Sequence, residues 1–96
     1  MRRLIWSRPA RRDLYDIANG YREIDPDLPL ILLERIEHAP LVLLDYPEIG
    51  SPTHQRGLRK WPVRQTPFVL LYASTRSEVE IRRVVHASSD WQALRP

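Results

Sequence analysis

The hydrophobic period of the chain changes after Gly57, and this change constrains the fold more than any other feature. Between residues 10 and 44, apolar side chains recur every three or four positions, which is the spacing of an amphipathic helix face. From residue 58 onward, apolar residues alternate with polar ones or form short runs, as they do in β-strands. Helical and extended patterns segregated in this way indicate an α+β domain with helices on one face of a largely antiparallel sheet.

The first half of the chain predicts a strand followed by a helix. Residues 2–6 have the composition of a short strand. Ser7 can cap the helix that follows, and Pro9 suits its first turn, where a missing backbone N–H costs no hydrogen bond. The Asp-Pro-Asp turn at 25–27 ends this helix.

A second apolar stripe predicts a second helix over 27–39, with a continuation to about residue 45. Pro40 lies inside this stripe and should kink or break the helix, because proline removes an intrahelical hydrogen bond. Residues 46–52 contain two prolines and a glycine, and they predict a turn. We therefore expect the two helices to form an antiparallel hairpin.

Three strands are predicted in the second half, over 58–63, 67–73 and 78–86. The run at 67–73 is almost continuously apolar, which is typical of a central strand covered on both faces. Strict alternation over 78–86 would place four side chains on one face, namely Val79, Ile81, Arg83 and Val85. The N-terminal strand should join this three-stranded sheet at an edge or beside the last strand, and residues 88–94 should form a short C-terminal turn or helix.

The charges are separated along the chain, although the formal net charge is only +3. Residues 1–12 carry five arginines and no acid, residues 13–48 carry nine acids and two arginines, and residues 49–96 carry eight cations and three acids. Such separation indicates either an interaction surface or two parts of one fold that complement each other. Both alternatives fit the charges alone.

Length and composition predict a single soluble domain that spans residues 1–96. A chain of 96 residues can form one two-layer core, and 43% hydrophobic with 28% charged residues is ordinary for a globular domain. The chain has no cysteine, which excludes a disulfide scaffold, a thiol nucleophile and a cysteine metal site. No signal peptide or membrane span is visible, so we expect a cytoplasmic protein without a membrane partner.

Several segments in a fixed order form a pattern that extends along nearly the whole chain. They are Ile5-Trp6-Ser7, Asp13-Leu14, Tyr46-Pro47-Glu48-Ile49-Gly50, Arg59, the run from Pro67 to Tyr72 and the run from Val79 to His86. Together with the helical hairpin, these segments resemble the RelE/ParE superfamily of type II toxin–antitoxin toxins. The resemblance implies the same α+β fold as the hydrophobic pattern does.

The two branches of this superfamily imply different activities. RelE-like toxins cut messenger RNA on the ribosome, whereas ParE-like toxins are not nucleases and inhibit DNA gyrase, a type II topoisomerase, by protein–protein contact. Both are neutralised by a cognate antitoxin, whose disordered C-terminal segment folds onto the toxin in a hetero-oligomer. The spacing of His86 and Asp90 resembles ParE-like members and favours that branch, while an inactive relative that only binds an antitoxin is a further alternative.

The nuclease alternative would require a base, an acid and cations around one phosphate. Its candidate residues are Arg59, Arg82 and His86. This set is incomplete, because no tyrosine follows His86. We therefore expect a binding protein with no catalytic residue and no cofactor, and no pair of histidines has the spacing of metal ligands.

The ParE-like alternative places target or antitoxin contacts on the basic sheet and the C-terminal segment. The predicted contact residues are Arg59, Arg64, Arg82, Arg83, His86 and Trp91. Because Arg82 and Arg83 are neighbours on a strand, one can meet a partner while the other pairs with an acid of the hairpin. Trp61 and Tyr72 are expected to pack against apolar neighbours.

Overall fold

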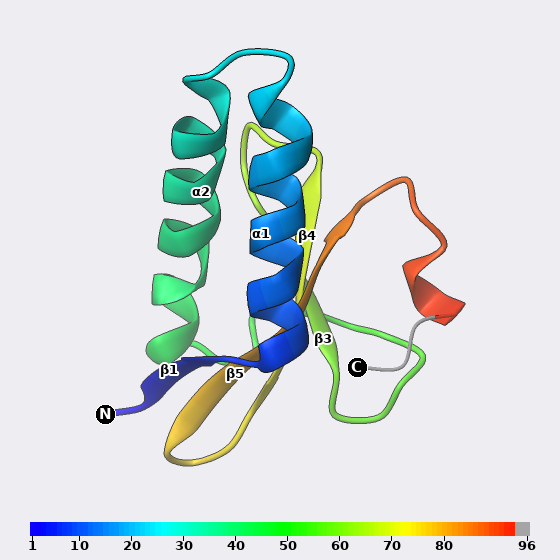
Figure 1. Ribbon diagram of the computed structural model, residues 1–96. Helices are drawn as coiled ribbons and strands as arrows, with labels where there is room; N and C mark the ends of the chain where they lie inside the picture. Colours follow the sequence, from blue (N-terminus) through cyan, green and yellow to red (C-terminus); the bar gives the residue numbers. More distant parts are fainter. Residues whose placement is uncertain (94–96) are drawn as a thin grey trace.

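The computed structural model describes residues 1–93 and confirms the predicted α+β arrangement (Figure 1). The predicted tail helix is present as a short turn, and its expected last residue, Leu94, lies outside the described residues. In chain order the elements are β1 (Arg3–Trp6), α1 (Arg8–Arg22), α2 (Leu28–His38), the 3₁₀-helix η1 (Ala39–Leu44), β2 (Ser51–Pro52), β3 (Arg59–Pro62), β4 (Phe68–Ser74), β5 (Glu78–His86) and the 3₁₀-helix η2 (Trp91–Ala93).

The helical hairpin forms for the reasons that its sequence suggests. The Ser7 hydroxyl accepts a hydrogen bond from the backbone N–H of Ala10 at 3.1 Å, and a proline occupies the first turn of α1. In α2 the regular helix ends at His38, and the chain continues as η1 past Pro40. The predicted break at Pro40 is therefore confirmed, and it rotates the side chains that follow relative to the stripe of α2.

The five strands form one sheet in the order β1-β5-β4-β3-β2. β1 lies at an edge and pairs in parallel with β5, the last strand, while the other neighbours are antiparallel. The predicted position of the first strand is thus confirmed. The sheet has one more strand than expected, because Ser51–Pro52, predicted as part of a turn, pairs with Lys60 and Arg59 of β3.

A β-bulge changes which face each residue of β5 occupies. The register with β4 shifts between Leu71 and Tyr72, so that β5 contains one extra residue there. As a result Val79, Ile81 and Val84 lie in the core below the helices, whereas Val85 lies in the cluster on the other face. The prediction that Val79 and Val85 share a face was wrong, since strict alternation does not continue through a bulge.

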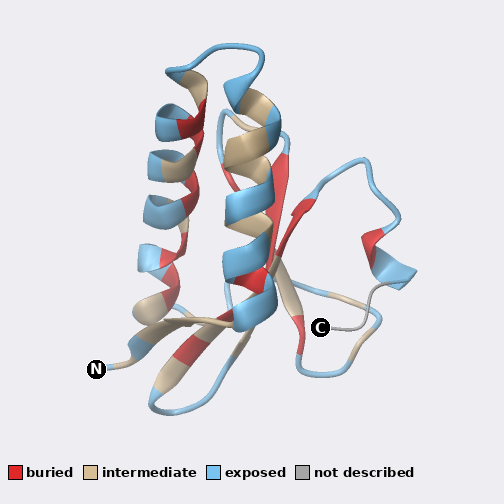
Figure 2. Ribbon diagram, viewed as in Figure 1, coloured by how far each residue is buried: buried red, intermediate tan, exposed pale blue. Residues whose placement is uncertain are grey.

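Two apolar clusters cover the two faces of the sheet (Figure 2). The larger cluster lies between the sheet and the inward sides of α1 and α2, and its most buried members include Ile36, Leu70 and Tyr72. The smaller cluster lies on the opposite face and consists of Leu58, Val69, Leu71, Val85 and Trp91. Strand β4 contributes to both clusters, which confirms the prediction of a central strand covered on both sides.

The carboxylate of Asp13 joins α1 to β5 at the bulge. β1 pairs with β5 only as far as Ile81, so the outer edge of β5 has no neighbouring strand beyond that residue. There the Asp13 Oδ2 atom accepts a hydrogen bond from the backbone N–H of Val84 at 2.9 Å. The two carboxylate oxygens also accept bidentate hydrogen bonds from Arg83 at 2.8 and 2.9 Å. The predicted pairing of one of the two arginines with an acid of the hairpin is confirmed for Arg83.

Replacing Asp13 by alanine should destabilise the fold by about 2 kcal/mol, because a partly buried guanidinium and a backbone N–H would both lose their acceptor. Urea unfolding measures this change in the free energy of unfolding. The matched control is Asp16→Ala, because Asp16 is exposed on the same helix and should change stability by less than about 0.5 kcal/mol. Equal losses in the two variants would contradict the role assigned to Asp13.

Candidate protein-binding groove and turn

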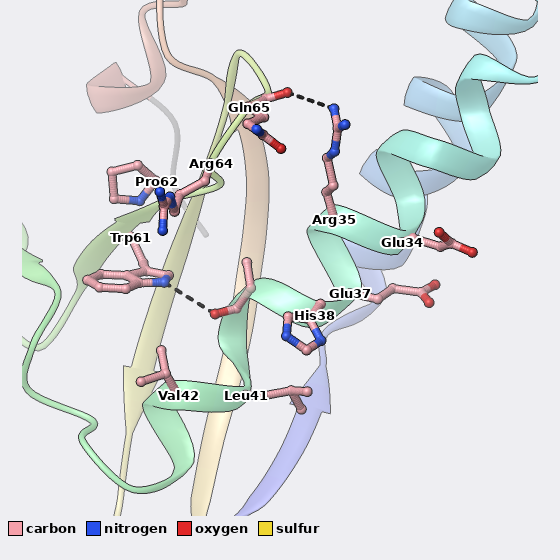
Figure 3. Close-up of a pocket in the computed structure, with 11 residues that line it drawn as sticks. Glu34, Arg35, Glu37, His38, Leu41, Val42, Trp61, Pro62, Arg64 and Gln65 are labelled. Carbon is pink, nitrogen blue, oxygen red and sulfur yellow. Dashed lines mark hydrogen bonds between the residues drawn. The ribbon is translucent and has the colours of Figure 1, made fainter.

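An open groove of about 1000 Å³ lies between the α2–η1 segment and the β3–β4 connection (Figure 3). One wall is formed by α2 and η1, and the other by the end of β3 and the loop after it. The lining residues are Glu34, Arg35, Glu37, His38, Ala39, Leu41, Val42, Trp61, Pro62, Arg64 and Gln65.

Two side-chain hydrogen bonds connect the walls of this groove (Figure 3). The indole N–H of Trp61 donates to the carbonyl oxygen of Ala39 at 3.2 Å. The guanidinium of Arg35 donates to the backbone carbonyl oxygen of Gln65 at 3.1 Å. Gln65 has a φ of 61°, in the left-handed region that residues other than glycine rarely adopt. The hydrogen bonds therefore fix the separation of the walls and hold the loop in a conformation that it would otherwise seldom take.

The groove combines exposed apolar side chains with charges of both signs. Leu41 and Val42 are 45% and 40% exposed, and the partly buried ring of Trp61 lies opposite them. Glu37 on the helical wall and Arg64 on the loop wall add charged groups at the margins. Such a surface fits an extended or helical segment with one apolar and one polar face. No group of three or more His, Cys, Asp or Glu residues that could hold a metal occurs among residues 1–93.

Most of the predicted contact arginines are engaged within the fold, and only Arg64 lines the groove. Arg59 donates to the carbonyl oxygens of Gly50 and Glu48 at 2.7 and 3.2 Å. Arg82 pairs with Glu80 at 2.9 Å. Arg83 pairs with Asp13, and the hydrogen bonds to that carboxylate raise the pKa of Arg83 above its ordinary value.

The predicted contact residues at the end of the chain have structural neighbours of their own. Trp91 is only 8% exposed, because it covers the smaller apolar cluster, and the Lys60 ammonium lies 5.7 Å from the centre of its ring. His86 is exposed at the end of β5, where its Nδ1 atom lies 2.6 Å from the hydroxyl of Ser88. Its ring also packs edge-on against Phe68, with the ring centres 5.8 Å apart.

The three residues of the nuclease alternative do not gather around one point. Arg59 is level with Tyr72 in the sheet, whereas His86 is level with Phe68. These two positions are four steps apart along β4, which corresponds to about 13 Å. Arg82 pairs with Glu80 on its own strand. These three residues are therefore spread over β3 and β5 instead of being level with one another in the sheet.

A turn over residues 46–50 forms a second surface feature, and Tyr72 holds it from inside. The Tyr72 hydroxyl donates to the carbonyl oxygen of Pro47 at 2.6 Å and accepts from the backbone N–H of Gly50 at 3.0 Å. Gly50 is required here, since a Cβ atom at this position would lie 2.5 Å from the same hydroxyl oxygen. Tyr72 is fully buried, which confirms that it packs, and burial raises its pKa above the ordinary value.

The exposed apolar residues of the groove and the turn were missed by the sequence reasoning. Leu41 and Val42 follow Pro40, so the helical stripe no longer indicates which of them point inward. Tyr46 and Ile49 lie in a segment predicted only as a turn. A usable signal was present, however, because residues 41–49 contain six large apolar residues, and Pro47 prevents one regular helix from placing them all on a single inward stripe.

No helix among residues 1–93 is long and apolar enough to cross a membrane.

The fold is that of a small toxin of the type II toxin–antitoxin class. The chain is similar over 90% of its length to a structure of the chromosomal ParDE toxin–antitoxin system of P. aeruginosa, with 96% of that chain covered, a TM-score of 0.78 and 26% identity. It shares its fold with a chain of the DinJ–YafQ toxin–antitoxin complex of E. coli, at a TM-score of 0.58 and 14% identity. The match covers 91% of this chain and 93% of that chain.

Sequence comparison assigns the family. The family model described as "ParE toxin of type II toxin-antitoxin system, parDE" matches residues 4–91. The Sinorhizobium fredii protein Y4kP, which carries the name of a toxin, is 31% identical over 90 residues, with 94% of this chain and 93% of that protein covered. The chain belongs to the ParE toxin family.

The raised pKa of Tyr72 predicts a loss of stability in alkaline solution. The fold favours the neutral phenol, so the stabilisation is complete below the unfolded pKa of about 10 and is lost as pH rises through the higher folded value. Tyr72→Phe should lose about 1 kcal/mol at neutral pH and should lack this alkaline decrease. Urea unfolding between pH 7 and 11 tests both effects, and Tyr15→Phe, at an exposed position, is the control that should follow the wild type. An unchanged pH profile in Tyr72→Phe would contradict the assignment.

Proposed function

We propose that this chain is a ParE-like toxin that inhibits DNA gyrase through protein–protein contact and is neutralised by a cognate antitoxin. The observation that carries the proposal is the match of residues 4–91 to the ParE toxin family. The similarity to a ParDE structure over 90% of the chain supports the same branch. We place this activity in the cytoplasm, where gyrase acts on the chromosome.

The geometry of the sheet supports inhibition by binding rather than by catalysis. Arg59, Arg82 and His86 are separated along the sheet, and both arginines are engaged by neighbouring groups. A ribonuclease would have to bring equivalent groups to one phosphate. Protein–protein inhibition needs no such convergence, since it depends on surface complementarity alone.

The groove is the surface that we assign to the antitoxin. The structures similar to this chain include toxin–antitoxin systems, which supports an antitoxin partner. Leu41, Val42 and Trp61 offer apolar contacts, while Glu37 and Arg64 can pair with charges on the bound segment. A disordered antitoxin segment can fold into such a groove, and part of the interaction energy then offsets the entropy of ordering it.

Purified toxin should inhibit the supercoiling activity of gyrase in vitro, and its expression should arrest growth with messenger RNA intact. His86→Ala should retain this toxicity, because the proposed mechanism uses no acid or base. Rapid cleavage of translated messages, abolished by His86→Ala, would instead establish the RelE-like alternative. A wild-type chain that binds the antitoxin but never slows growth would establish the inactive relative.

The groove assignment predicts that Val42→Glu weakens antitoxin binding at least tenfold, or about 1.4 kcal/mol, because a carboxylate would replace an apolar contact. Isothermal titration with the antitoxin measures this change. Ile31→Glu is a matched control, since Ile31 is also β-branched, is 42% exposed compared with 40% for Val42, and lies on α2 outside the groove lining. Equal losses from the two substitutions would refute the location of the site.

A further inference from the structure

The turn at residues 46–50 combines a fixed backbone with exposed apolar side chains. Tyr46 is 62% exposed and Ile49 is 44% exposed, although both belong to the large apolar residues that folding normally covers. Single exposed apolar residues are common on protein surfaces and need no explanation. Here, however, an aromatic and an aliphatic side chain stand three residues apart on one turn, which makes a local apolar surface.

The buried hydroxyl of Tyr72 and the half-buried guanidinium of Arg59 hold the backbone of this turn in place. Tyr72 bonds the carbonyl of Pro47 and the N–H of Gly50, and Arg59 bonds the carbonyls of Glu48 and Gly50. Across the turn itself, the N–H of Ile49 donates to the carbonyl oxygen of Tyr46 at 3.3 Å. A surface that is already ordered loses little conformational entropy when it binds, so its apolar contacts contribute more of their energy to affinity.

A shallow hollow of about 510 Å³ lies beside the turn and is lined in part by Arg2, Asp45 and Glu48. The guanidinium of Arg2 is engaged, because it donates to the carbonyl oxygens of Thr75 and Leu44 at 2.9 and 3.5 Å. Asp45 and Glu48 form no ion pair within the described part of the chain. The apolar turn is therefore bordered by two carboxylates that are available to cations of a partner.

We propose that the 46–50 turn is the surface by which this toxin contacts its folded target protein. The inference rests on the proposed function, since it assumes that the chain acts by binding a protein. It commits to a target surface with an apolar pocket for Tyr46 and Ile49 and with cationic groups that face Asp45 and Glu48. Aromatic side chains are the residues that most often dominate the energy of such contacts.

Shape separates this target from the antitoxin. A groove receives a linear segment that folds as it binds, whereas an exposed turn whose backbone is held by hydrogen bonds fits a preformed pocket on a folded protein. The groove provides the first kind of surface and the 46–50 turn provides the second. The antitoxin as occupant of the turn is consequently the alternative that an experiment must exclude.

The test compares Tyr46→Ala, Ile49→Ala and the double variant with the wild type. The concentration of purified toxin that half-inhibits gyrase supercoiling should rise at least tenfold in the double variant, as expected for loss of a central aromatic contact. Growth arrest on expression should weaken in parallel, while antitoxin affinity and the thermal unfolding midpoint should stay near the wild-type values. Leu30→Ala is the matched control, because Leu30 is 66% exposed on α2 and lies outside both the groove lining and the turn.

Each contrary outcome has a definite meaning. Full toxicity in the double variant would overturn the inference, and a loss of antitoxin affinity by the same factor would assign the turn to the antitoxin instead. If the double variant unfolds, the single variants decide whether the turn contacts the target. Each of them removes one exposed side chain and leaves the hydrogen bonds of Tyr72 and Arg59 to the turn intact. If the wild type arrests growth without inhibiting gyrase, the topoisomerase assignment fails, but the comparison of growth arrest between wild type and variants still decides whether the turn contacts the target.

Discussion

The hydrogen bonds of Asp13 to β5 are the interaction on which the two-layer arrangement depends. β1 leaves the sheet after Trp6, and the chain turns directly into α1, so the outer edge of β5 would otherwise have unpaired backbone groups. Asp13 replaces the missing strand at Val84, and the Ser7 hydroxyl does the same by donating to the carbonyl oxygen of Arg82 at 2.9 Å. The short segment of residues 7–13, the N-cap and first turns of α1, thereby completes the sheet edge, caps the helix and neutralises Arg83.

Three ion pairs show where some of the charges that are separated along the chain lie in the fold. Pairing of β1 with β5 brings the basic N-terminus beside the basic last strand, but acids of the fold neutralise much of the result through Arg3–Glu78, Arg82–Glu80 and Arg83–Asp13. The sheet face opposite the helices is covered in addition by Trp91 and its neighbours. Among these three pairs, only Arg83–Asp13 joins the acidic middle of the chain to a basic end, so complementarity between the separated charges is seen at that contact. The surfaces that we assign to partners, the groove and the turn, instead combine exposed apolar side chains with charged groups at their margins.

Hydrophobic periodicity was sufficient to predict the two helices and the strands β3, β4 and β5, because their apolar side chains recur at helical or strand spacing. It failed where local geometry interrupts the repeat. The bulge opposite Leu71 moved Val85 to the other face, and Ser51–Pro52 was too short to carry a strand pattern. Arg59 was predicted as a contact or catalytic cation, yet it bonds the carbonyls of the 46–50 turn. Composition alone cannot distinguish an arginine that is available to a partner from one that donates hydrogen bonds within the fold. The difference depends on which backbone carbonyls the fold brings close to the guanidinium.

The groove and the turn are separate surfaces, but they share one rigid connection. The 3₁₀-helix η1 lines the groove with Leu41 and Val42, and the carbonyl oxygen of Val42 accepts the backbone N–H of Tyr46 at 3.0 Å. A ligand in the groove therefore lies one helical turn from the residues that we assign to the target. A segment bound there would need little additional length to obstruct the turn sterically, so the neutralisation that we propose would not require the toxin to change shape. Pro40 contributes to this arrangement, because the regular helix ends at His38 and η1 then exposes Leu41 and Val42 while Leu43 stays buried.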